Sequence, residues 1–327
     1  MTTGTPPSRR RPTWPELPAP VRAAIEARLG APVTGWTSHD GGYSPGLAST
    51  LRTDGGAVFV KAVGVSHEFA ATLYRQEARR SALLPRGVPA PRARWLLDVP
   101  TDDGAWVAVA SDAVAGRTPT SPLRGRDLDA VAQLALRVGE HEVAPGVLPE
   151  VADELPTSCT ATLAAERPAG LATLDPWFTT HLDRLADLER HAPEAVAGTR
   201  LVHGDLRADN TLLVEPAPDG GRAAGAGPAA LAVDWAYPAR GAAFCDLVGM
   251  LPATQAEGGP APEDVLARHP LPHGTDEDAV TAYLVALTGY FVHSSLQPPP
   301  PGIPHVRAFQ RVQGEAGVAW LRRRLGG

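Results

Sequence analysis

Residues 201–214, LVHGDLRADNTLLV, decide how this sequence is interpreted. Two apolar segments flank a polar loop that contains His203, Asp205 and Asn210. A loop carboxylate can orient a hydroxyl nucleophile or accept its proton, and an asparagine carbonyl can bind Mg²⁺. Each of these residues alone is more often a turn former or a helix cap. The ordered set HxDxxxxN between two strand-like segments is much rarer by chance, so it indicates chemistry.

A second carboxylate, Asp234, lies near the end of the next apolar segment, ALAVDW at 230–235. This segment and TLLV at 211–214 are typical of a β-hairpin. The glycine-rich residues between them, 216–229, are not followed by a helical pattern, which favours a surface loop over a phosphate-binding cradle. A hairpin that begins after Asn210 and ends at Asp234 returns both side chains to one edge. The pattern therefore predicts a Mg²⁺ site beside the loop carboxylate.

Lys61 lies inside the apolar segment VFVKAV, residues 58–63. A lysine at such a position must either extend to solvent or meet an anion. The following residues 66–84 have helical periodicity, with Glu77 on the inward face. We therefore predict a Lys61–Glu77 pair beside nucleotide phosphates. Glu68 is a competing partner for the lysine, and a solvated Glu77 is the structural alternative.

The chain has a strand-rich part followed by a mostly helical part. In the first part, the turn Asp54-Gly55-Gly56 is the strongest hairpin signal. The patterned segments are, in chain order, a helix at 18–29, strands within 33–63, a helix at 66–84, strands at 92–99 and 104–111, and helices at 127–141, 175–190, 276–296 and 304–325. Residues 33–111 are therefore expected to form a sheet with one inserted helix.

Composition limits the possible partners. The 327 residues suffice for two lobes with separate cores. The net charge of −6 argues against nucleic acid as the main partner. No apolar run approaches the length of a membrane span, and residues 1–20 lack the apolar core of a signal peptide. With only Cys159 and Cys245, which do not suggest a disulfide framework, we expect a cytoplasmic protein without a membrane partner.

Two common kinds of catalytic site have no support in the sequence. The ten histidines are scattered, without an HExxH motif or a pair spaced for zinc. The GxSxG match at 42–46, GYSPG, lies in an expected turn between strands and is not followed by a helix, so an acyl hydrolase has no support.

Together these motifs resemble the aminoglycoside phosphotransferase family of the protein-kinase-like fold. The matching parts are Gly41–Ser49 as a glycine-containing nucleotide loop, Lys61 in VFVKAV, Glu77 in YRQEARR, HGDLRADN at 203–210 and VDW at 233–235. The resemblance covers roughly residues 33 to 250. It implies a bilobal α+β fold with a small N-terminal antiparallel-sheet lobe with one helix and a larger, mostly helical C-terminal lobe. The expected divisions are a flexible arm at 1–15, a nucleotide-binding lobe at 16–113 and a helical lobe at 114–327.

The resemblance also implies roles in catalysis and metal binding. Asp205 would be the catalytic base or the group that orients the acceptor hydroxyl. Asn210 and Asp234 would hold Mg²⁺. Arg207 stands where the family often has a histidine, and it would either reach the transferring phosphate or be a surface residue. Asp246 resembles a later aspartate of the family that supports the catalytic loop, although the cap of the following helix is an alternative role.

For the nucleotide, ATP or GTP, the resemblance implies contacts in the first lobe. Lys61 would contact the α- and β-phosphates and be held by Glu77. Ser44 would sit over the phosphates. The segment that contains Ser111, Asp112 and Val114 would be the hinge whose backbone meets the purine.

The function implied is transfer of the γ-phosphate of a Mg-nucleoside triphosphate to a hydroxyl of an antibiotic or a related natural product. A metabolic sugar or amino-alcohol kinase is an alternative, and a catalytically inactive kinase-like binding protein is an alternative of another class. The full set of Lys61, Asp205, Asn210 and Asp234 favours an enzyme. Four acidic residues of the second lobe could bind a cationic acceptor, but a solvated face is the better interpretation: Asp127, Asp129, Glu140 and Glu142.

Overall fold

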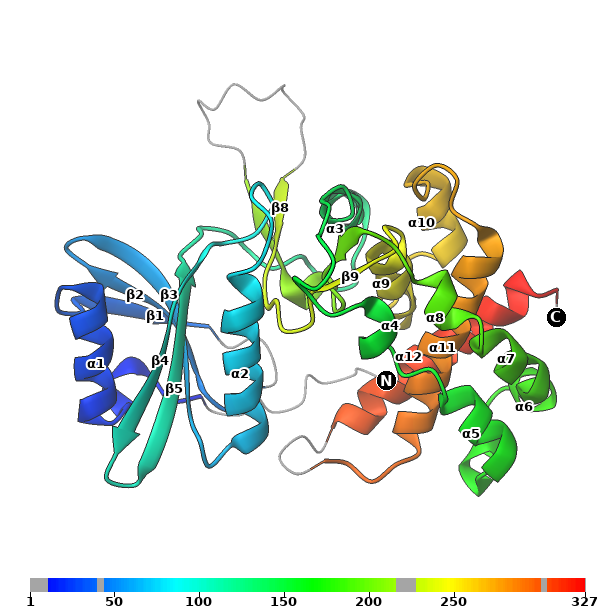
Figure 1. Ribbon diagram of the computed structural model, residues 1–327, viewed down its shortest axis with the longest axis horizontal. Helices are drawn as coiled ribbons and strands as arrows, with labels where there is room; N and C mark the ends of the chain where they lie inside the picture. Colours follow the sequence, from blue (N-terminus) through cyan, green and yellow to red (C-terminus); the bar gives the residue numbers. More distant parts are fainter. Residues whose placement is uncertain (1–10, 40–43, 216–227, 301–304, 327) are drawn as a thin grey trace. The chain divides into compact units, whose positions relative to one another are not determined.

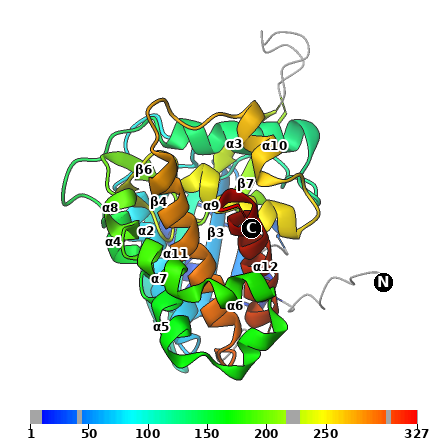
Figure 2. The same ribbon diagram turned by 90° about the vertical axis from the view of Figure 1, so that its right-hand side faces the viewer.

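The computed structural model describes residues 11–39, 44–215, 228–300 and 305–326. The chain forms two compact units, which are drawn in Figures 1 and 2. The first comprises the chain up to Leu84, Ala90–Ala115 and Val233–Ala236. The second comprises Pro85–Pro89, Gly116–Ala232 and the chain from Tyr237. The predicted single boundary, between residues 113 and 114, therefore differs from the structure. Pro85–Pro89 belongs to the second unit although it precedes this boundary, and Val233–Ala236 belongs to the first unit although it follows it.

The first unit is built on a five-stranded antiparallel sheet with the strand order β1-β2-β3-β5-β4. The strands are β1 (Gly35–Ser38), β2 (Leu47–Thr53), β3 (Gly56–Gly64), β4 (Ala93–Thr101) and β5 (Gly104–Asp112). The turn predicted at Asp54-Gly55-Gly56 joins β2 to β3, in register from Thr53 opposite Gly56. The predicted antiparallel sheet is confirmed.

Helices α1 (Ala19–Leu29) and α2 (Glu68–Ser81) lie on opposite faces of this sheet (Figure 1). The alternation of side chains along β3 explains the arrangement. Val60 and Ala62 belong to the apolar cluster that contains α1, whereas Val63 belongs to the cluster that contains α2. Lys61 shares the face of Val63, so its side chain is directed to α2. The period of two along the strand thus decides which helix meets the lysine.

The prediction of a flexible arm at 1–15 is wrong for residues 11–15. Trp14 is 4% exposed and lies in the cluster that contains α1. It begins a short 3₁₀ helix, Trp14–Glu16, which is closed by a capping box in which the Thr13 backbone N–H donates to Glu16 Oε2 at 2.8 Å. Burial of one tryptophan outweighs the disorder-prone composition around it.

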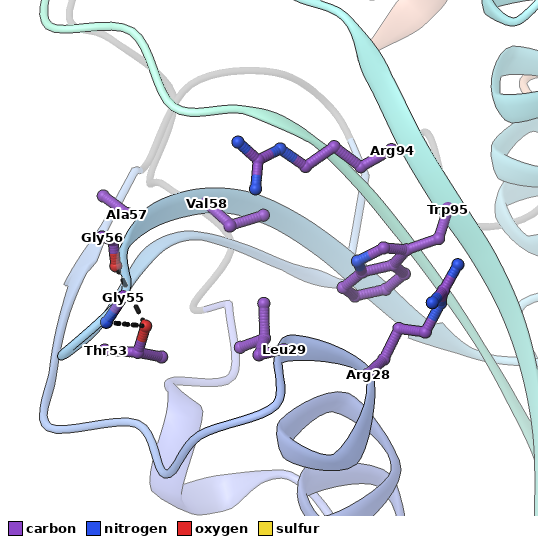
Figure 3. A pocket seen from close by; sticks show the side chains of 9 residues that line it. All are labelled: Arg28, Leu29, Thr53, Gly55, Gly56, Ala57, Val58, Arg94 and Trp95. Atoms are coloured by element: carbon purple, nitrogen blue, oxygen red, sulfur yellow. Dashed lines mark hydrogen bonds between the residues drawn. The ribbon is translucent and has the colours of Figure 1, made fainter.

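A shallow pocket of about 360 Å³ lies on the α1 side of the sheet (Figure 3). It is bounded by the end of α1, the β2–β3 turn and the beginning of β4. Arg94 lies at a β-bulge between Ala93 and Trp95, and its Nε donates to Asp112 Oδ1 at 2.7 Å. This pocket is on the opposite face from Lys61, so it is separate from the charged cluster described below.

The second unit is mostly helical. Its helices are α3 (Gly125–Val138), α4 (Val151–Glu154), α5 (Cys159–Glu166), α6 (Pro176–Thr180), α7 (Leu182–Glu189), α8 (Ala192–Ala195), α9 (Cys245–Ala256), α10 (Pro262–Arg268), α11 (Glu277–Ser295) and α12 (Val306–Arg324). The four helices predicted after residue 125 are present, with the one at 175–190 divided into α6 and α7 at His181.

Two small antiparallel sheets interrupt the helices of the second unit. Strands β6 (Arg200–Val202) and β9 (Ala239–Gly241) form one, and β7 (Thr211–Val214) and β8 (Ala229–Ala232) form the other. The predicted hairpin is therefore confirmed, but its second strand ends at Ala232, before the VDW motif. The residues before β7 and after β8 leave the same end of the hairpin, because Thr211 pairs with Ala232.

Helices α11 and α12 approach closely at two glycines of α12 (Figure 2). A Cβ on Gly314 would lie 3.0 Å from Val292 Cγ2, and a Cβ on Gly317 would lie 2.4 Å from Thr288 Oγ1. Thr288 is 1% exposed and β-branched, so it has little freedom to move. The crossing therefore requires glycine at 317.

Replacement of Gly317 by alanine is expected to lower the free energy of unfolding by about 1–2 kcal/mol. Overpacking costs about 1–3 kcal/mol, and the better helix propensity of alanine returns up to about 1 kcal/mol. Urea unfolding of the variant and the wild type measures the difference. Gly55→Ala is the control, since its Cβ would meet only Thr53 Oγ1, at 3.6 Å. Equal stability of Gly317→Ala and wild type would contradict the packing argument.

Candidate active site

The HGD loop, residues 203–210, connects β6 to β7 in the second unit. The buried carboxylate of Asp246 holds its beginning, since it accepts hydrogen bonds from the backbone N–H groups of His203 at 2.7 Å and Gly204 at 3.0 Å. Gly204 has a φ of 81°, and a Cβ there would lie 2.5 Å from the Tyr237 carbonyl oxygen. The loop therefore requires glycine at its second position.

Asp246 supports the loop, as the resemblance implied, and the alternative role of a helix cap is wrong. Asp246 is the second residue of α9, and its carboxylate binds backbone groups of the loop rather than those of its own helix.

Burial raises the pKa of Asp246 to about 7, against the opposing effect of the two backbone donors; the negative charge of Asp205 adds to the rise. A carboxyl group whose pKa is higher in the folded protein contributes most to stability below its unfolded pKa, near 4. This contribution is lost as the pH rises toward 7. The stability of the wild type relative to Asp246→Asn, which does not titrate, should therefore fall between pH 4.5 and 7.5, by about 3 kcal/mol. Urea unfolding of both proteins at the two pH values measures the change, and a constant difference would contradict the assignment.

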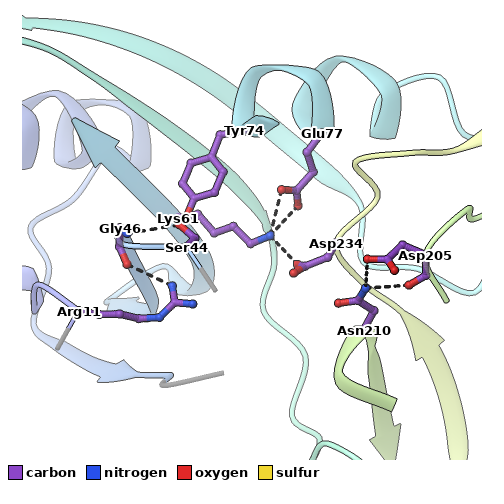
Figure 4. A network of polar contacts seen from close by, with 9 residues as sticks. All are labelled: Arg11, Ser44, Gly46, Lys61, Tyr74, Glu77, Asp205, Asn210 and Asp234. Carbon is purple, nitrogen blue, oxygen red and sulfur yellow. Dashed lines mark hydrogen bonds and ion pairs between the residues drawn. The ribbon is translucent and has the colours of Figure 1, made fainter. Parts of the chain in front are cut away.

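Asp205 and Asn210 are in direct contact in the HGD loop (Figure 4). Asn210 Nδ2 donates to the Asp205 carbonyl oxygen at 2.8 Å and to Asp205 Oδ2 at 3.0 Å. Asn210 is 6% exposed, whereas 41% of the Asp205 side chain is exposed. The amide nitrogen is thus occupied by Asp205, and the amide oxygen is the end of the side chain that can bind a cation.

Arg207 is not a surface residue, because only 15% of its side chain is exposed. Its Nη2 donates to Asp209 Oδ2 at 3.0 Å, and its Nε lies 3.3 Å from Asp205 Oδ1. Its guanidinium lies over the ring of Phe309, 4.9 Å from the centroid. The side chain is therefore held within the second unit by two carboxylates and an aromatic ring.

The predicted Lys61–Glu77 pair is present in the first unit (Figure 4). Lys61 Nζ donates to Glu77 Oε1 at 3.0 Å and to Oε2 at 2.9 Å. It also donates to Asp234 Oδ1 at 2.5 Å. The partners of the lysine are thus Glu77 and Asp234 rather than Glu68. The alternative of a solvated Glu77 is wrong, since 17% of its side chain is exposed.

The electrostatics of this cluster favour a charged lysine. Burial opposes the charge of Lys61, but the carboxylates of Asp234 and Glu77 outweigh burial and raise its pKa. Asp234 has a φ of 62°, in the left-handed region, which is uncommon for a residue with a side chain. Such backbone conformations are found preferentially at functional sites. The first unit therefore holds a fixed cation between two carboxylates.

Part of the proposed nucleotide loop is also held in the first unit. Ser44 Oγ and the Tyr74 hydroxyl share a hydrogen bond, and the Gly46 backbone N–H donates to Ser44 Oγ at 3.3 Å. Arg11 Nη1 donates to the Gly46 carbonyl oxygen at 3.1 Å, and the Tyr74 ring lies 5.7 Å from Lys61 Nζ. Residues 41–43 of the predicted loop lie outside the described residues.

The predicted hinge begins where β5 ends, at Asp112. Ser111 pairs with Phe59 of β3 and with Ala93 of β4. The Asp112 side chain is bound to Arg94, and its backbone N–H donates to the Arg92 carbonyl oxygen at 2.9 Å. The role of Asp112 in purine binding, which the resemblance implies, stays a prediction. Val114 follows outside the strand, and its role stays a prediction.

Several contacts could not be found from the sequence. Tyr74, Arg11 and Phe309 have no motif around them, and each acts through a partner that is distant in the chain. The acidic residue Asp127 binds Arg117 by two hydrogen bonds, of 2.7 and 2.8 Å. Those bonds lower the pKa of Asp127 to about 2. Asp127 is therefore a structural partner of Arg117 and not a free charge for an acceptor.

Two kinds of feature are absent from the part of the chain that the structure describes. Among residues 11–39, 44–215, 228–300 and 305–326, no group of three or more His, Cys, Asp and Glu is arranged to hold a metal ion. In the same part of the chain, no helix combines the length and the apolar composition needed to cross a membrane.

No protein-family model and no curated protein matches this chain. Solved structures do match it. A variant of the aminoglycoside phosphotransferase APH(4)-Ia, in a ternary complex with AMP-PNP and hygromycin B, has 12% identity and a TM-score of 0.57 over 95% of this chain and 100% of its own. Spectinomycin phosphotransferase APH(9)-Ia, in complex with ADP and spectinomycin, has 12% identity and a TM-score of 0.53 over 92% and 97%. An ethanolamine kinase from Plasmodium vivax has 12% identity and a TM-score of 0.55 over 89% and 83%. The chain therefore has the bilobal α+β, protein-kinase-like fold of the aminoglycoside phosphotransferases, which the resemblance in sequence implied.

Proposed function

We propose that this protein transfers the γ-phosphate of a Mg-nucleoside triphosphate to a hydroxyl group of a small molecule. The observation that carries the proposal is the pair of residue clusters, one in each unit of a kinase-like fold. In the first unit, Lys61 is fixed by Glu77 and Asp234. In the second, Asp205 is fixed by Asn210. These are the parts that phosphoryl transfer needs: a cation for the phosphates, a carboxylate for the hydroxyl and ligands for the metal.

The residues present fit a magnesium ion. Mg²⁺ is usually bound by one or two carboxylates together with phosphate oxygens of the substrate and water, rather than by a complete protein cage. The lack of a larger acidic cluster in the described residues is consistent with such a site. The carboxylate of Asp234 and the amide oxygen of Asn210 would hold the ion, which neutralises phosphate charge when bound.

The protein's own groups would orient and stabilise the reacting atoms. Asp205 would accept a hydrogen bond from the acceptor hydroxyl and take its proton as the phosphate is transferred. Lys61 would bind the α- and β-phosphates, and Ser44 and its neighbouring amides would cover them. The backbone at Ser111–Val114 would meet the purine. Catalysis would rest on orientation and charge neutralisation, because phosphoryl transfer requires little other chemistry from the protein.

We propose an antibiotic or a related hydroxylated natural product as the acceptor, in the cytoplasm where nucleotide is available. Two of the matching structures are complexes with the antibiotics spectinomycin and hygromycin B, which supports this class of acceptor. An amino-alcohol acceptor is the second candidate, favoured by the match to an ethanolamine kinase. Nucleic acid and membrane are not proposed as partners. An inactive binding protein is less well supported, because the complete set of four residues is retained in the arrangement described above.

A mass-spectrometric screen for phosphate addition tests the proposal. The protein, with Mg²⁺ and either ATP or GTP, is incubated with aminoglycosides, other hydroxylated antibiotics, sugars and amino alcohols. We expect a product 80 Da heavier than one class of acceptor, about the mass that a transferred PO₃H group adds. Binding of nucleotide is measured in parallel by calorimetry. A protein that binds no nucleotide in the presence of Mg²⁺ would rule out the proposed function.

A further inference from the structure

Each carboxylate oxygen of Asp205 contacts a different residue of the HGD loop. Oδ2 accepts the hydrogen bond from Asn210 Nδ2 at 3.0 Å. Oδ1 lies 3.3 Å from Arg207 Nε, in an ion pair without a hydrogen bond from Nε. The hydrogen bond on one side and the ion pair on the other favour one orientation of the carboxylate, although 41% of the side chain is exposed. Arg207 therefore has a contact that bears directly on the group proposed to meet the acceptor hydroxyl.

The position of Arg207 depends in turn on helix α12. The guanidinium lies over the ring of Phe309, in the first turn of this helix, at 4.9 Å from the centroid. A cation–π contact favours the position of the guanidinium over the ring. Because Arg207 also binds the carboxylate of Asp209, the ring helps to fix the arrangement in which the guanidinium contacts Asp205 as well.

A second carboxylate, that of Asp209, also binds Arg207. It accepts a hydrogen bond from Arg207 Nη2 at 3.0 Å. Without a fixed ring beneath it, the guanidinium could turn toward Asp209 and lose its contact with Asp205.

Helix α12 is a rigid support for this ring. Its close crossing with α11 at Gly314 and Gly317 leaves no space for a Cβ. In the turn that follows Phe309, the buried Gln310 donates from Nε2 to the Tyr290 hydroxyl of α11 at 3.3 Å. The backbone that carries Phe309 is therefore fixed by the packing of α12 against α11.

We propose that Phe309 and Arg207 form a positioning pair for Asp205, through which helix α12 sets the orientation of the carboxylate. The inference rests on the proposed function, in which Asp205 meets the acceptor hydroxyl. It assigns Arg207 to the orientation of this group rather than to the transferring phosphate. It also makes Phe309 a residue on which turnover depends although it is far from the loop in sequence. Misplacement of a reacting group by about 1 Å can reduce turnover by about 10²-fold.

Steady-state kinetics of four variants test the pair: Arg207→Met, Phe309→Leu, Phe309→Tyr and the double variant of the first two. Arg207→Met should lower kcat by about 10–100-fold and leave the nucleotide KM within about twofold. Phe309→Leu should lower kcat in the same direction by a smaller factor, and Phe309→Tyr, which retains the ring, should restore it. The double variant should match Arg207→Met alone, because Phe309 acts through the arginine. Arg311→Met is the matched control, since Arg311 lies on the same helix but donates to Glu315 and to the Thr173 carbonyl oxygen.

Two kinetic outcomes would overturn the inference. A large rise in nucleotide KM in Arg207→Met, with kcat unchanged, would show that Arg207 binds phosphate. Multiplicative effects of Arg207→Met and Phe309→Leu in the double variant would show that Phe309 acts independently of the arginine.

Hydrogen exchange of the HGD loop gives a readout that does not require turnover. The backbone N–H of Asn210 donates to the Arg207 carbonyl oxygen at 3.1 Å. Exchange at Asn210 should be faster in Arg207→Met and Phe309→Leu than in wild type, and unchanged in Phe309→Tyr and Arg311→Met. Unchanged exchange in Phe309→Leu would overturn the role of the ring. If the wild type transfers phosphate to no acceptor but these exchange rates differ as expected, the proposed function fails while the structural coupling stands.

Discussion

Replacement of Asp205 by asparagine is expected to lower kcat for phosphate transfer by about 10²–10⁴-fold, the range for loss of a general base. Asparagine has nearly the same shape, and its carbonyl oxygen can still accept the hydrogen bond that Asn210 Nδ2 now donates to Oδ2. It cannot take the proton of the acceptor hydroxyl at neutral pH. The dissociation constant of Mg-nucleotide should stay within about twofold of wild type, because Lys61 and Asp234 are unaffected. Turnover with an acceptor found in the screen and calorimetry with nucleotide measure the two quantities.

Asp209→Asn is the matched control for this variant. Asp209 is in the same loop and accepts a hydrogen bond from the same arginine, and 45% of its side chain is exposed. The same chemical change should therefore lower kcat by less than about tenfold, as expected for an exposed ion pair. Wild-type turnover in Asp205→Asn would show that another group meets the hydroxyl. A similar loss in both variants would mean that the loop, rather than one carboxylate, is responsible.

Replacement of Asp234 by asparagine is expected to lower kcat/KM by about 10²–10³-fold, the range for loss of a group that stabilises charge in the transition state. It should also weaken binding of Mg-nucleotide, because the residue is both the proposed metal ligand and a partner of Lys61. Asparagine is chosen over alanine because it adopts the left-handed backbone conformation, φ 62° here, at little cost. The measurement is a titration of Mg²⁺ at constant nucleotide, followed by calorimetry and by turnover.

Asp98→Asn is the matched control in the first unit. Asp98 also binds a basic residue, Arg75, but 53% of its side chain is exposed, and surface ion pairs contribute about 0–1 kcal/mol. This variant should resemble wild type in all three measurements. If Asp234→Asn bound Mg-nucleotide as tightly as wild type and over the same Mg²⁺ range, Asp234 would not be a metal ligand.

The parts of the site that could be predicted from the sequence are those whose signal lies within a short stretch of the chain. A lysine in VFVKAV must extend to solvent or meet an anion, and the period of the next helix places Glu77 on the inward face as a candidate partner. The ordered set HxDxxxxN marked Asp205 and Asn210 as candidate site residues, whereas the hydrogen bonds between them are a finding of the structure. The antiparallel sheet and the helices were predictable for the same reason, because turn residues and apolar periods are short-range signals.

Other parts of the site are decided by contacts between distant segments. Trp14 packs in a core cluster, so that residues 11–15 are ordered against their composition. Asp246 accepts hydrogen bonds from the HGD loop, as the resemblance implied, but its place in the sequence left a helix cap as an alternative. The contact of Arg207 with Phe309 requires helix α12 to lie beside the loop. The residues in these contacts have no fixed spacing in the sequence from which the contacts could be predicted.

The sequence by itself determined the type of fold and which residues can do chemistry, since both depend on local periodicity and on residue type. Only the tertiary structure decided how these residues are held: the left-handed backbone of Asp234, the two-sided contact of the Asp205 carboxylate and the support of the HGD loop by Asp246. The physical reason is that a buried polar group must find a partner, but any residue that the fold brings near can supply it.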